Sequence, residues 1–225
     1  MKVEEFYNNI SATYTDLLDR AVPKYREMLG TMFHYLPNDF KPLRILELGC
    51  GTGNLTEYII TAYPEAQLTV VDISAEMLAE CRSRCKTSTT ITYCQSDFND
   101  LAFEANSFDL IISSIAIHHL EDSNKQLLFN KLYSFTKPNG IFTYVDQCKG
   151  KTDEIYAKHM AAWKREAFKL GSTQENWETW MDHQERHDYH APPKDQIQWM
   201  ENAGFNNIDV LWKNLLWTVF YAEKT

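Results

Sequence analysis

Long apolar runs are absent from this chain of 225 residues, because no stretch approaches the roughly 18 consecutive apolar residues of a membrane-spanning helix. The N-terminal segment MKVEEFYNNI lacks the apolar core of a secretory signal. Cysteine is scarce as well: the 5 cysteines form no CxxC pair, and an odd number of this kind is typical of reduced thiols. We therefore expect a cytoplasmic protein with no membrane partner.

Basic residues are too few to indicate a nucleic-acid-binding surface. Lys and Arg number 22 against 31 Asp and Glu, which gives a formal net charge of −9. Contacts to a phosphate backbone depend on clustered Lys and Arg. The charge balance therefore disfavours a nucleic acid as partner and favours a small molecule, while a homodimer stays open as the assembly.

Short apolar runs alternate with amphipathic runs through the middle of the chain. They predict strands at 43–48, 67–72, 91–95, 108–114 and 140–146, with helices at 54–62, 74–86 and 123–136. Apolar strands joined by helices of this length form parallel sheets that are covered on both faces. We therefore predict a doubly wound α/β fold with a mostly parallel seven-stranded sheet. Runs 206–212 and 215–222 are expected to close it as an antiparallel pair.

The pattern differs at the N-terminus and after the fifth predicted strand. Residues 3–36 follow helical spacing up to a joint near Ala21–Pro23, since proline interrupts a helix. Residues 150–190 are polar, rich in Trp and His, and predict two or three helices. We expect an N-terminal helical cap at 1–40, a ligand-binding core at 41–149 and 191–225, and a helical insert at 150–190 that forms a lid.

Three glycines follow the first predicted strand, at Gly49, Gly51 and Gly53 of LELGCGTG. GxGxG without a following GK[ST] is not a phosphate-cradling P-loop, and it departs from the GxGxxG spacing that binds pyrophosphate. The glycines predict either a turn where a ligand approaches the backbone or a tight strand-to-helix corner. In an open α/β sheet, ligands bind beyond the carboxyl ends of the strands, so the residues after the next strands bear on this choice.

Acidic residues stand at the ends of the next two predicted strands. Asp72 follows Gly53 at the spacing where a βαβ unit places a carboxylate near ribose hydroxyls. Ser74 is the better candidate for the helix N-cap, which leaves Asp72 available to a ligand. Asp97 and Phe98 follow the third strand, where a carboxylate can accept a hydrogen bond from an exocyclic amine beside a purine. A turn aspartate is the alternative.

The stretches LELGCGTG, VVDIS.EML, CQSDF and FDLIISS..IHHL, in this order and spacing, resemble the class I S-adenosylmethionine-dependent methyltransferases. The match covers about 45–146. The resemblance implies a Rossmann-like methyltransferase fold and S-adenosyl-L-methionine as cofactor. It implies that Asp72 holds the ribose hydroxyls, that Ile73 and Met77 flank the adenine, and that Asp97 takes the adenine amine. The cofactor residues we expect in all are Tyr14, Tyr25, Glu47, Gly49, Cys50, Gly51, Gly53, Asp72, Ile73, Met77, Asp97, Phe98 and Ser114. Tyr14, on the first predicted helix, either caps the methionine end of the cofactor or packs on the core.

The stretches LLDRAVPKY, ISAEMLAECR and AGF are similar to the carboxy-S-adenosylmethionine synthase branch, which serves tRNA wobble-uridine modification. In that branch a tyrosine matching Tyr25 contacts the cofactor, and an arginine in the insert holds the extra carboxylate. The matching place here falls near Trp180–Met181, and the nearest arginine is Arg186. We therefore predict a methyltransferase that acts on a small-molecule acceptor by in-line displacement. The carboxy-cofactor synthase and a non-catalytic S-adenosylmethionine-binding module are the alternatives.

Histidines supply the candidate catalytic groups. His118 and His119 follow the fourth predicted strand, where one of them acts as a base or is a buried histidine bonded to backbone. For acceptor contacts we expect Tyr7, Trp163, Trp177, His187 and His190. Together with Asp182 or Asp188, His183, His187 and His190 have the residue types of a metal site, with a solvated amphipathic helix as the alternative. Our expectation is that no metal is bound.

Overall fold

The computed structural model describes residues 2–86 and 90–225 of the chain. In this part the strands form one sheet of seven, in the order β3-β2-β1-β4-β5-β7-β6. Their bounds are β1 Arg44–Leu48, β2 Gln67–Asp72, β3 Ile91–Gln95, β4 Phe108–Ser114, β5 Thr136–Gln147, β6 Asn206–Asn214 and β7 Trp217–Lys224. β1 to β5 are parallel, and β7 is antiparallel to both β5 and β6. The predicted doubly wound, mostly parallel sheet with an antiparallel closing pair is confirmed.

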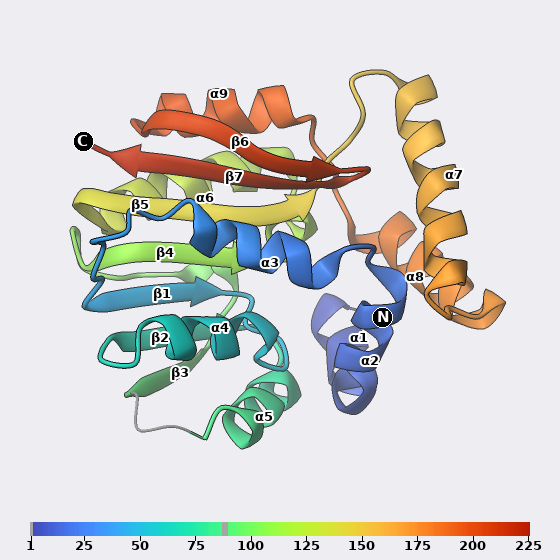
Figure 1. Ribbon diagram of the computed structural model, residues 1–225, viewed down its shortest axis with the longest axis horizontal. Helices are drawn as coiled ribbons and strands as arrows, with labels where there is room; N and C mark the ends of the chain where they lie inside the picture. Colours follow the sequence, from blue (N-terminus) through green and yellow to red (C-terminus); the bar gives the residue numbers. More distant parts are fainter. Residues whose placement is uncertain (1, 87–89) are drawn as a thin grey trace.

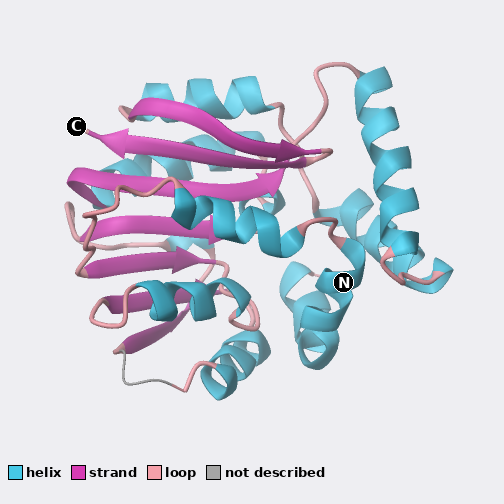
Figure 2. Ribbon diagram, viewed as in Figure 1, coloured by secondary structure: helices cyan, strands magenta, loops and turns pink. Residues whose placement is uncertain are grey.

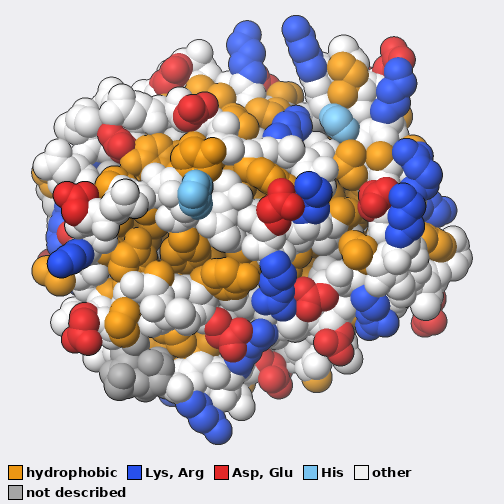
Figure 3. Space-filling view, in the orientation of Figure 1, with side chains coloured by type: hydrophobic (Ala, Val, Ile, Leu, Met, Phe, Trp, Pro, Cys, Tyr) orange, Lys and Arg blue, Asp and Glu red, His pale blue; other side chains and the backbone are white. Residues whose placement is uncertain are grey.

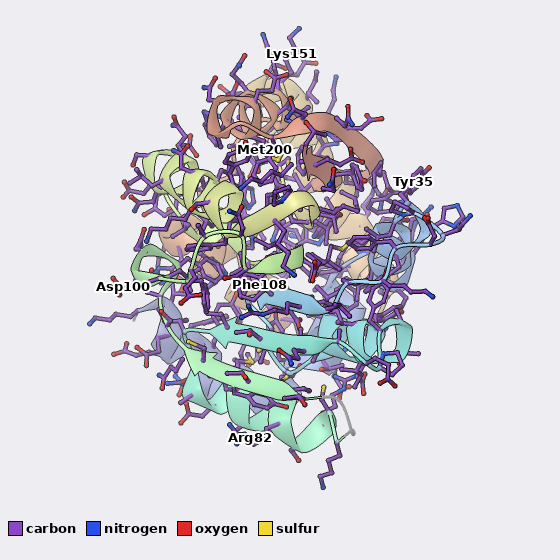
Figure 4. All side chains as sticks on the ribbon, turned by 90° about the vertical axis from the view of Figure 1, so that its left-hand side faces the viewer. Tyr35, Arg82, Asp100, Phe108, Lys151 and Met200 are labelled. Carbon is purple, nitrogen blue, oxygen red and sulfur yellow. The ribbon has the colours of Figure 1, made fainter. Side chains whose placement is uncertain are left out.

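Helices cover both faces of this sheet (Figure 1), and Figure 2 shows the same layers by secondary structure. α3 Tyr25–His34, α4 Asn54–Ala62 and α5 Ala75–Arg84 lie on one face. α6 Asp122–Phe135 and α9 Pro193–Ala203 pack together on the other. In Figure 4, which views the molecule from the left-hand side of Figure 1, the labelled Tyr35 and Asp100 lie on opposite sides of the sheet. The sheet is therefore the middle of three layers.

Each central strand contributes apolar side chains to two cores, one on each face of the sheet. In β4, Leu110 and Ile112 belong to the core beneath α3 and α4, whereas Ile111 belongs to the core beneath α6 and α9. Burial on both faces explains why consecutive residues at the centre of a strand, such as Leu110, Ile111 and Ile112, are apolar. Burial of each such side chain contributes about 1.5–3 kcal/mol to the free energy of unfolding.

Four helices lie together beyond the carboxyl ends of the parallel strands (Figure 1): α1 Val3–Ile10, α2 Tyr14–Ala21, α7 Asp153–Lys169 and α8 Gln174–His187. α2 packs against α7, and α1 packs against α5. Lys and Arg side chains gather on the outer side of this end, over α7 (Figure 3). Segments from distant parts of the sequence thus meet at the edge where the loops of the sheet emerge.

The N-terminal region is divided differently from the prediction. A short 3-10 turn at Ser11–Thr13 separates α1 from α2, a break that the apolar spacing did not indicate. α3 packs on the sheet, against β5, β6 and β7, and an Arg26–Asp19 ion pair at 3.1 Å joins it to α2. The fifth strand begins at Thr136 and not at Gly140, and it takes in Asn139 with a left-handed backbone. Among residues 2–86 and 90–225, no helix is both long and apolar enough to cross a bilayer.

Candidate active site

A pocket, which we call the main pocket, opens beside β1 and β4, where the strand order reverses. Open α/β sheets bind ligands at this point, beyond the carboxyl ends of the strands. The pocket wall consists of the loops after β1 to β4 and of residues from the N-terminal helices. Its residues are Val3, Tyr7, Tyr14, Gly49, Gly51, Asp72, Ile73, Met77, Ser96, Asp97, Phe98, Ile115, Ala116, His119 and Leu120. Most of the predicted cofactor residues therefore line one pocket.

The three glycines after β1 all have a left-handed backbone, with φ of +67° at Gly49, +51° at Gly51 and +89° at Gly53. Residues other than glycine rarely adopt this conformation. A Cβ would lie 2.3 Å from Ala116 Cβ at position 49, 3.3 Å from the Tyr14 ring at position 51, and 2.9 Å from Cys85 Sγ at position 53. Gly49 and Gly53 thus serve close packing within the protein. Of the three glycines, Gly51 best fits the interpretation of a turn where a ligand approaches the backbone.

Gly53→Ala should destabilise the fold, because the added Cβ meets Cys85 Sγ at 2.9 Å and Cys81 Sγ at 3.1 Å. With the strained φ of +89°, we expect a loss of about 1–3 kcal/mol in the free energy of unfolding, measured by chemical denaturation. The matched control is Gly30→Ala in α3, where nothing lies within 4 Å of the new Cβ. Helix propensity predicts a gain of about 0.5–1 kcal/mol there. Equal stabilities of the two variants would contradict this account of the loop.

Asp72 ends β2 at the main pocket and is 8% exposed. Its Oδ2 accepts a hydrogen bond from the Gly51 N–H at 2.8 Å, and its Oδ1 accepts one from the Ser74 N–H at 2.9 Å. The Ser74 hydroxyl caps α5 by accepting from the Met77 N–H, so the predicted N-cap is confirmed. Burial raises the pKa of Asp72 to about 6, against the lowering effect of the two amide donors. The carboxylate ties the glycine loop to α5, and its further lone pairs can accept from a ligand.

The other end of the main pocket lies after β3. Asp97 Oδ1 accepts hydrogen bonds from the backbone and side-chain amides of Asn99, at 2.8 and 2.9 Å, and so caps the turn that follows. Ile73, Met77 and Phe98 supply apolar wall to the same pocket. Asp97 is therefore both the turn aspartate of the alternative interpretation and part of the pocket wall. Apolar walls with a few polar groups fit a flat, amine-bearing ring.

Two smaller cavities adjoin the main pocket, and Tyr14 and Ile115 line all three. The loop cavity runs beneath the glycine loop and is lined by Tyr25, Cys50 and Ser114 among others. The Ser114 hydroxyl is buried and has no hydrogen-bond partner among the described residues. Ile115 has a φ of +52°, a strained conformation for a β-branched residue. Backbone strain of this kind clusters at binding and catalytic sites.

The insert cavity lies between the N-terminal helices and the helical insert. Its residues are Tyr7, Tyr14, Leu18, Ala21, Val22, Ile115, His118, Gln147, Trp163, Trp180, His183 and Asp188. It shares Tyr7, Tyr14 and Ile115 with the main pocket. The two spaces therefore have a common wall, made of two tyrosines and the strained isoleucine.

Four imidazoles surround the buried carboxylate of Asp188 at this wall. Asp188 Oδ1 lies 3.1 Å from His119 Nδ1 and 3.6 Å from both His118 Nε2 and His183 Nε2. Asp188 Oδ2 lies 3.6 Å from His190 Nε2. We call these five residues the histidine cluster. Because His119 lines the main pocket while His118, His183 and Asp188 line the insert cavity, the cluster borders both.

In three histidines of the cluster, the ring nitrogen that faces away from Asp188 is hydrogen-bonded to a neighbouring residue. His118 Nδ1 lies 2.5 Å from Asp146, His119 Nε2 lies 2.8 Å from Tyr7, and His190 Nδ1 lies 2.7 Å from Tyr156. The Tyr189 N–H donates to the His118 carbonyl at 2.8 Å, which fixes the segment carrying Asp188 against the loop after β4. Strands β4 and β5 and the end of α8 thus position the cluster together.

Protonation in the cluster follows from burial and from the central carboxylate. Burial alone would raise the pKa of Asp188, but His118, His119 and His190 hold it well below its usual range. Burial lowers the pKa of His183 to about 3, and burial with the neighbouring His118 lowers that of His119. Burial also opposes the charge on His118, yet the carboxylates of Asp146 and Asp188 outweigh it and raise its pKa. An ionised aspartate therefore faces mostly neutral imidazoles.

Some predicted ligand residues lie outside the walls of these cavities. Glu47 is buried beside α4, where its Oε2 accepts a hydrogen bond from the Thr56 hydroxyl at 2.7 Å. Gly53 packs against α5, as described above. Trp177 packs edge-on against Trp163 with ring centroids 4.9 Å apart, and of this pair it is Trp163 that lines the insert cavity. Glu47 and Trp177 thus contact other parts of the protein and lie outside the walls of the three cavities.

The three histidines considered for a metal site are divided by the structure. α8 ends at His187, so the chain turns before Asp188 and His190. His183 and His190 face Asp188, whereas the His187 ring lies 5.2 Å from that of His183 and its carbonyl oxygen lies 3.4 Å from His119 Nδ1. His187 and His190 do not line the three cavities.

Sequence reasoning assigned no role to Asp146, and it considered Asp188 only as one of two alternative metal partners. Asp146 stands near the end of β5, so the strand-end rule that identified Asp72 also applies to it. The sequence gives no periodic signal for Asp188, because the residues around it come from distant elements.

Comparison with known proteins identifies residues 45–140 as a methyltransferase domain. The carboxy-S-adenosyl-L-methionine synthase of Helicobacter pylori (strain J99) is 24% identical over 251 aligned positions, covering 98% of this chain and 94% of that protein. The malonyl-[acyl-carrier protein] O-methyltransferase of Bacillus anthracis is 35% identical over 102 positions, covering 45% of this chain and 36% of that protein. The chain spans only about a quarter to a half of several curated relatives that it matches.

Solved structures share the fold over the whole chain. The phosphoethanolamine N-methyltransferase 2 of Haemonchus contortus, in complex with phosphomonomethylethanolamine and S-adenosylhomocysteine, superposes with a TM-score of 0.68 at 18% identity. The match covers 100% of this chain and 61% of that protein. The matched domain, residues 45–140, contains the glycine loop and the strand-end residues Asp72 and Asp97. Residues 45–140 thus match a methyltransferase domain, and the chain is similar in sequence to methyltransferases and to a carboxy-S-adenosyl-L-methionine synthase and in fold to a methyltransferase.

Proposed function

We propose that this protein transfers a methyl group from S-adenosyl-L-methionine to a small-molecule acceptor. The observation that carries the proposal is the common wall of the main pocket and the insert cavity, formed by Tyr7, Tyr14 and Ile115. A cofactor in the main pocket and an acceptor in the insert cavity would meet there. Methyl transfer is an in-line displacement, and holding two reactants in line can supply most of its rate.

In this proposal the adenosine lies along Ile73 and Phe98, and Asp72 accepts hydrogen bonds from the two ribose hydroxyls. The burial of Asp72 and its place at the end of β2 support this role. Asp97 accepts from the adenine amine. The methionine part extends along the glycine loop toward Ser114, whose buried hydroxyl has no partner among residues 2–86 and 90–225.

The insert cavity suits a small molecule with a hydroxyl or an amine. Trp163 and Trp180 supply aromatic wall, and Gln147 and the histidine cluster supply polar groups. An acceptor lone pair attacks the methyl carbon, the carbon–sulfur bond breaks with its electrons going to sulfur, and S-adenosylhomocysteine is released. The proton of the acceptor passes to the histidine cluster. The insert closes the site against water, which would otherwise weaken these interactions.

Cofactor binding should weaken in acid, because the pKa of Asp72 lies near 6. Ribose hydroxyls donate best to an ionised carboxylate, so binding favours the deprotonated form, which is lost as the pH falls through 6. One pH unit below its pKa, only about a tenth of the carboxyl groups are ionised, so we expect an affinity about tenfold lower at pH 5 than at pH 7.5. Calorimetric titration at both pH values measures this. Asp72→Asn should show a flat profile, and a wild-type profile equally flat would contradict the assignment.

A carboxy-S-adenosylmethionine synthase is the second candidate, because the Helicobacter pylori relative matches 98% of this chain. An additional carboxylate on the cofactor calls for a cationic partner. Among the described residues, no Lys or Arg lines the three cavities. Arg186 lies on an exposed side of α8, paired with Asp182 at 2.7 Å. Incubation with S-adenosylmethionine and prephenate should therefore yield no carboxylated cofactor by mass spectrometry, and its detection would favour this second candidate.

Release of S-adenosylhomocysteine tests the proposed reaction directly. A panel of small hydroxyl and amine compounds is incubated with the protein and S-adenosylmethionine, and we expect turnover with at least one acceptor. A chain that binds the cofactor but releases no product with any acceptor would instead be a binding module.

A further inference from the structure

We propose that the histidine cluster is a binding site for a divalent transition-metal ion, with His118 Nε2, His119 Nδ1 and Asp188 Oδ1 as ligands. These three atoms lie within 4.8 Å of one another. The site is defined by its geometry and goes beyond methyl transfer. It reverses our expectation from the sequence that no metal is bound, and its ligand set differs from the three insert histidines considered there.

The spacing of the ligand atoms fits a shared ion. Atoms bound to one ion at about 2.0–2.2 Å lie roughly 2.8–3.6 Å apart in tetrahedral or octahedral geometry. Asp188 Oδ1 lies 3.1 Å from His119 Nδ1 and 3.6 Å from His118 Nε2. This oxygen is buried and has no hydrogen-bond partner in the part of the chain that the structure describes. His183 Nε2, 3.6 Å from the same oxygen, has none there either. Buried polar atoms without partners are rare in folded proteins, so their convergence on one point indicates a ligand.

The outer contacts of the two histidines are those of metal ligands. A ligating histidine generally donates its other ring N–H to a carboxylate, a carbonyl or another polar group, which fixes its tautomer and orientation. His118 Nδ1 lies 2.5 Å from Asp146 Oδ1, and His119 Nε2 lies 2.8 Å from Tyr7 Oη. The bond to Asp146 leaves the lone pair of His118 Nε2 directed at Asp188. His119 Nδ1 lies 3.1 Å from Asp188 Oδ1 and 3.4 Å from the His187 carbonyl oxygen, so an ion bound there replaces a proton on this nitrogen.

Two imidazoles and one carboxylate favour zinc or iron(II) over magnesium or calcium, which prefer oxygen ligands. Three protein ligands leave coordination positions open, and His183 lies beside them. Since the cluster borders both the main pocket and the insert cavity, an ion there is placed to bind an acceptor oxygen and lower its pKa. This role toward the acceptor rests on the proposed function, whereas the site itself does not.

The metal content of the full chain tests the site. The protein is expressed without a histidine tag, purified without chelator and measured by inductively coupled plasma mass spectrometry. We expect about one zinc or iron ion per chain, and a loss of about tenfold or more in His118→Gln and in Asp188→Asn. His34→Gln is the matched control, because His34 is exposed at the end of α3, and it should keep the metal.

Circular dichroism establishes whether each variant is folded, and a second measurement needs no variant. Chelator-stripped wild type is titrated with Zn²⁺ in a calorimeter, and one-site binding is expected. Absence of both copurified metal and Zn²⁺ uptake would overturn the proposal, as would metal retained in both folded variants. S-adenosylmethionine binding and acceptor turnover, measured on the same samples, test the proposed function separately, so that either proposal can fail while the other stands.

Discussion

Asp72→Asn is expected to weaken the binding of S-adenosylmethionine about 100-fold, or about 2.7 kcal/mol. The substitution keeps the shape of the side chain but replaces one acceptor with a donor. Two hydrogen bonds from the ribose to a carboxylate are worth about 1.5–3 kcal/mol each, so losing most of one and weakening the other gives this figure. S-adenosylmethionine and S-adenosylhomocysteine carry the same ribose. The affinity for S-adenosylhomocysteine should therefore fall by the same factor. Isothermal titration calorimetry with the two ligands measures both losses.

The matched control for this variant is Asp100→Asn, an acid-to-amide change in the exposed turn after β3 and outside the main pocket. Its affinity should equal that of wild type. Asp72 also accepts hydrogen bonds from Gly51 and Ser74, so the unfolding midpoint of each variant is measured alongside. Unchanged affinity in folded Asp72→Asn would contradict the ribose assignment. A loss confined to S-adenosylmethionine would contradict it too, because it would connect Asp72 to the sulfonium charge.

Tyr7→Phe is expected to lower the turnover number about 100-fold while cofactor affinity stays within about threefold. The variant removes only the hydroxyl that lies 2.8 Å from His119 Nε2, at the wall between the main pocket and the insert cavity. Without this contact His119 is no longer oriented, and the histidine cluster loses its alignment with the reacting groups. Release of S-adenosylhomocysteine, with an acceptor that wild type methylates, gives the turnover number.

Tyr35→Phe is the control for this change, because Tyr35 is 51% exposed and lies after α3 (Figure 4). It should be indistinguishable from wild type. If Tyr7→Phe kept wild-type turnover, the Tyr7–His119 contact would have a role in packing and none in the reaction. A parallel loss of cofactor affinity in Tyr7→Phe would assign the tyrosine to cofactor binding and not to the acceptor side.

The fold and much of the main pocket could be predicted because their signals are local. Short, mostly apolar segments mark the strands of a sheet that is buried on both faces, as Leu110 and Ile111 illustrate in β4. The ends of those strands then identify Asp72 and Asp97, since parallel strands bring their carboxyl ends to one edge. The distinct packing roles of Gly49 and Gly53 could not be predicted, because their neighbours Ala116 and Cys85 come from other elements.

The acceptor side could be predicted only in part, because distant segments build it. His118 and Asp188 come together because the Tyr189 N–H bonds to the His118 carbonyl, and no sequence period encodes that contact. His183 and His187 share helical spacing, yet only His183 faces Asp188, since α8 ends at His187 and the chain turns away. Spacing along one helix was therefore a poor guide to a cluster whose centre lies beyond that helix.

A crystal structure of the full chain with S-adenosylhomocysteine tests the central claim most directly. We predict that both ribose hydroxyls lie within hydrogen-bond distance of Asp72, with the sulfur beside Tyr14 and facing the insert cavity. A ligand bound outside the main pocket, or a ribose turned away from Asp72, would contradict it.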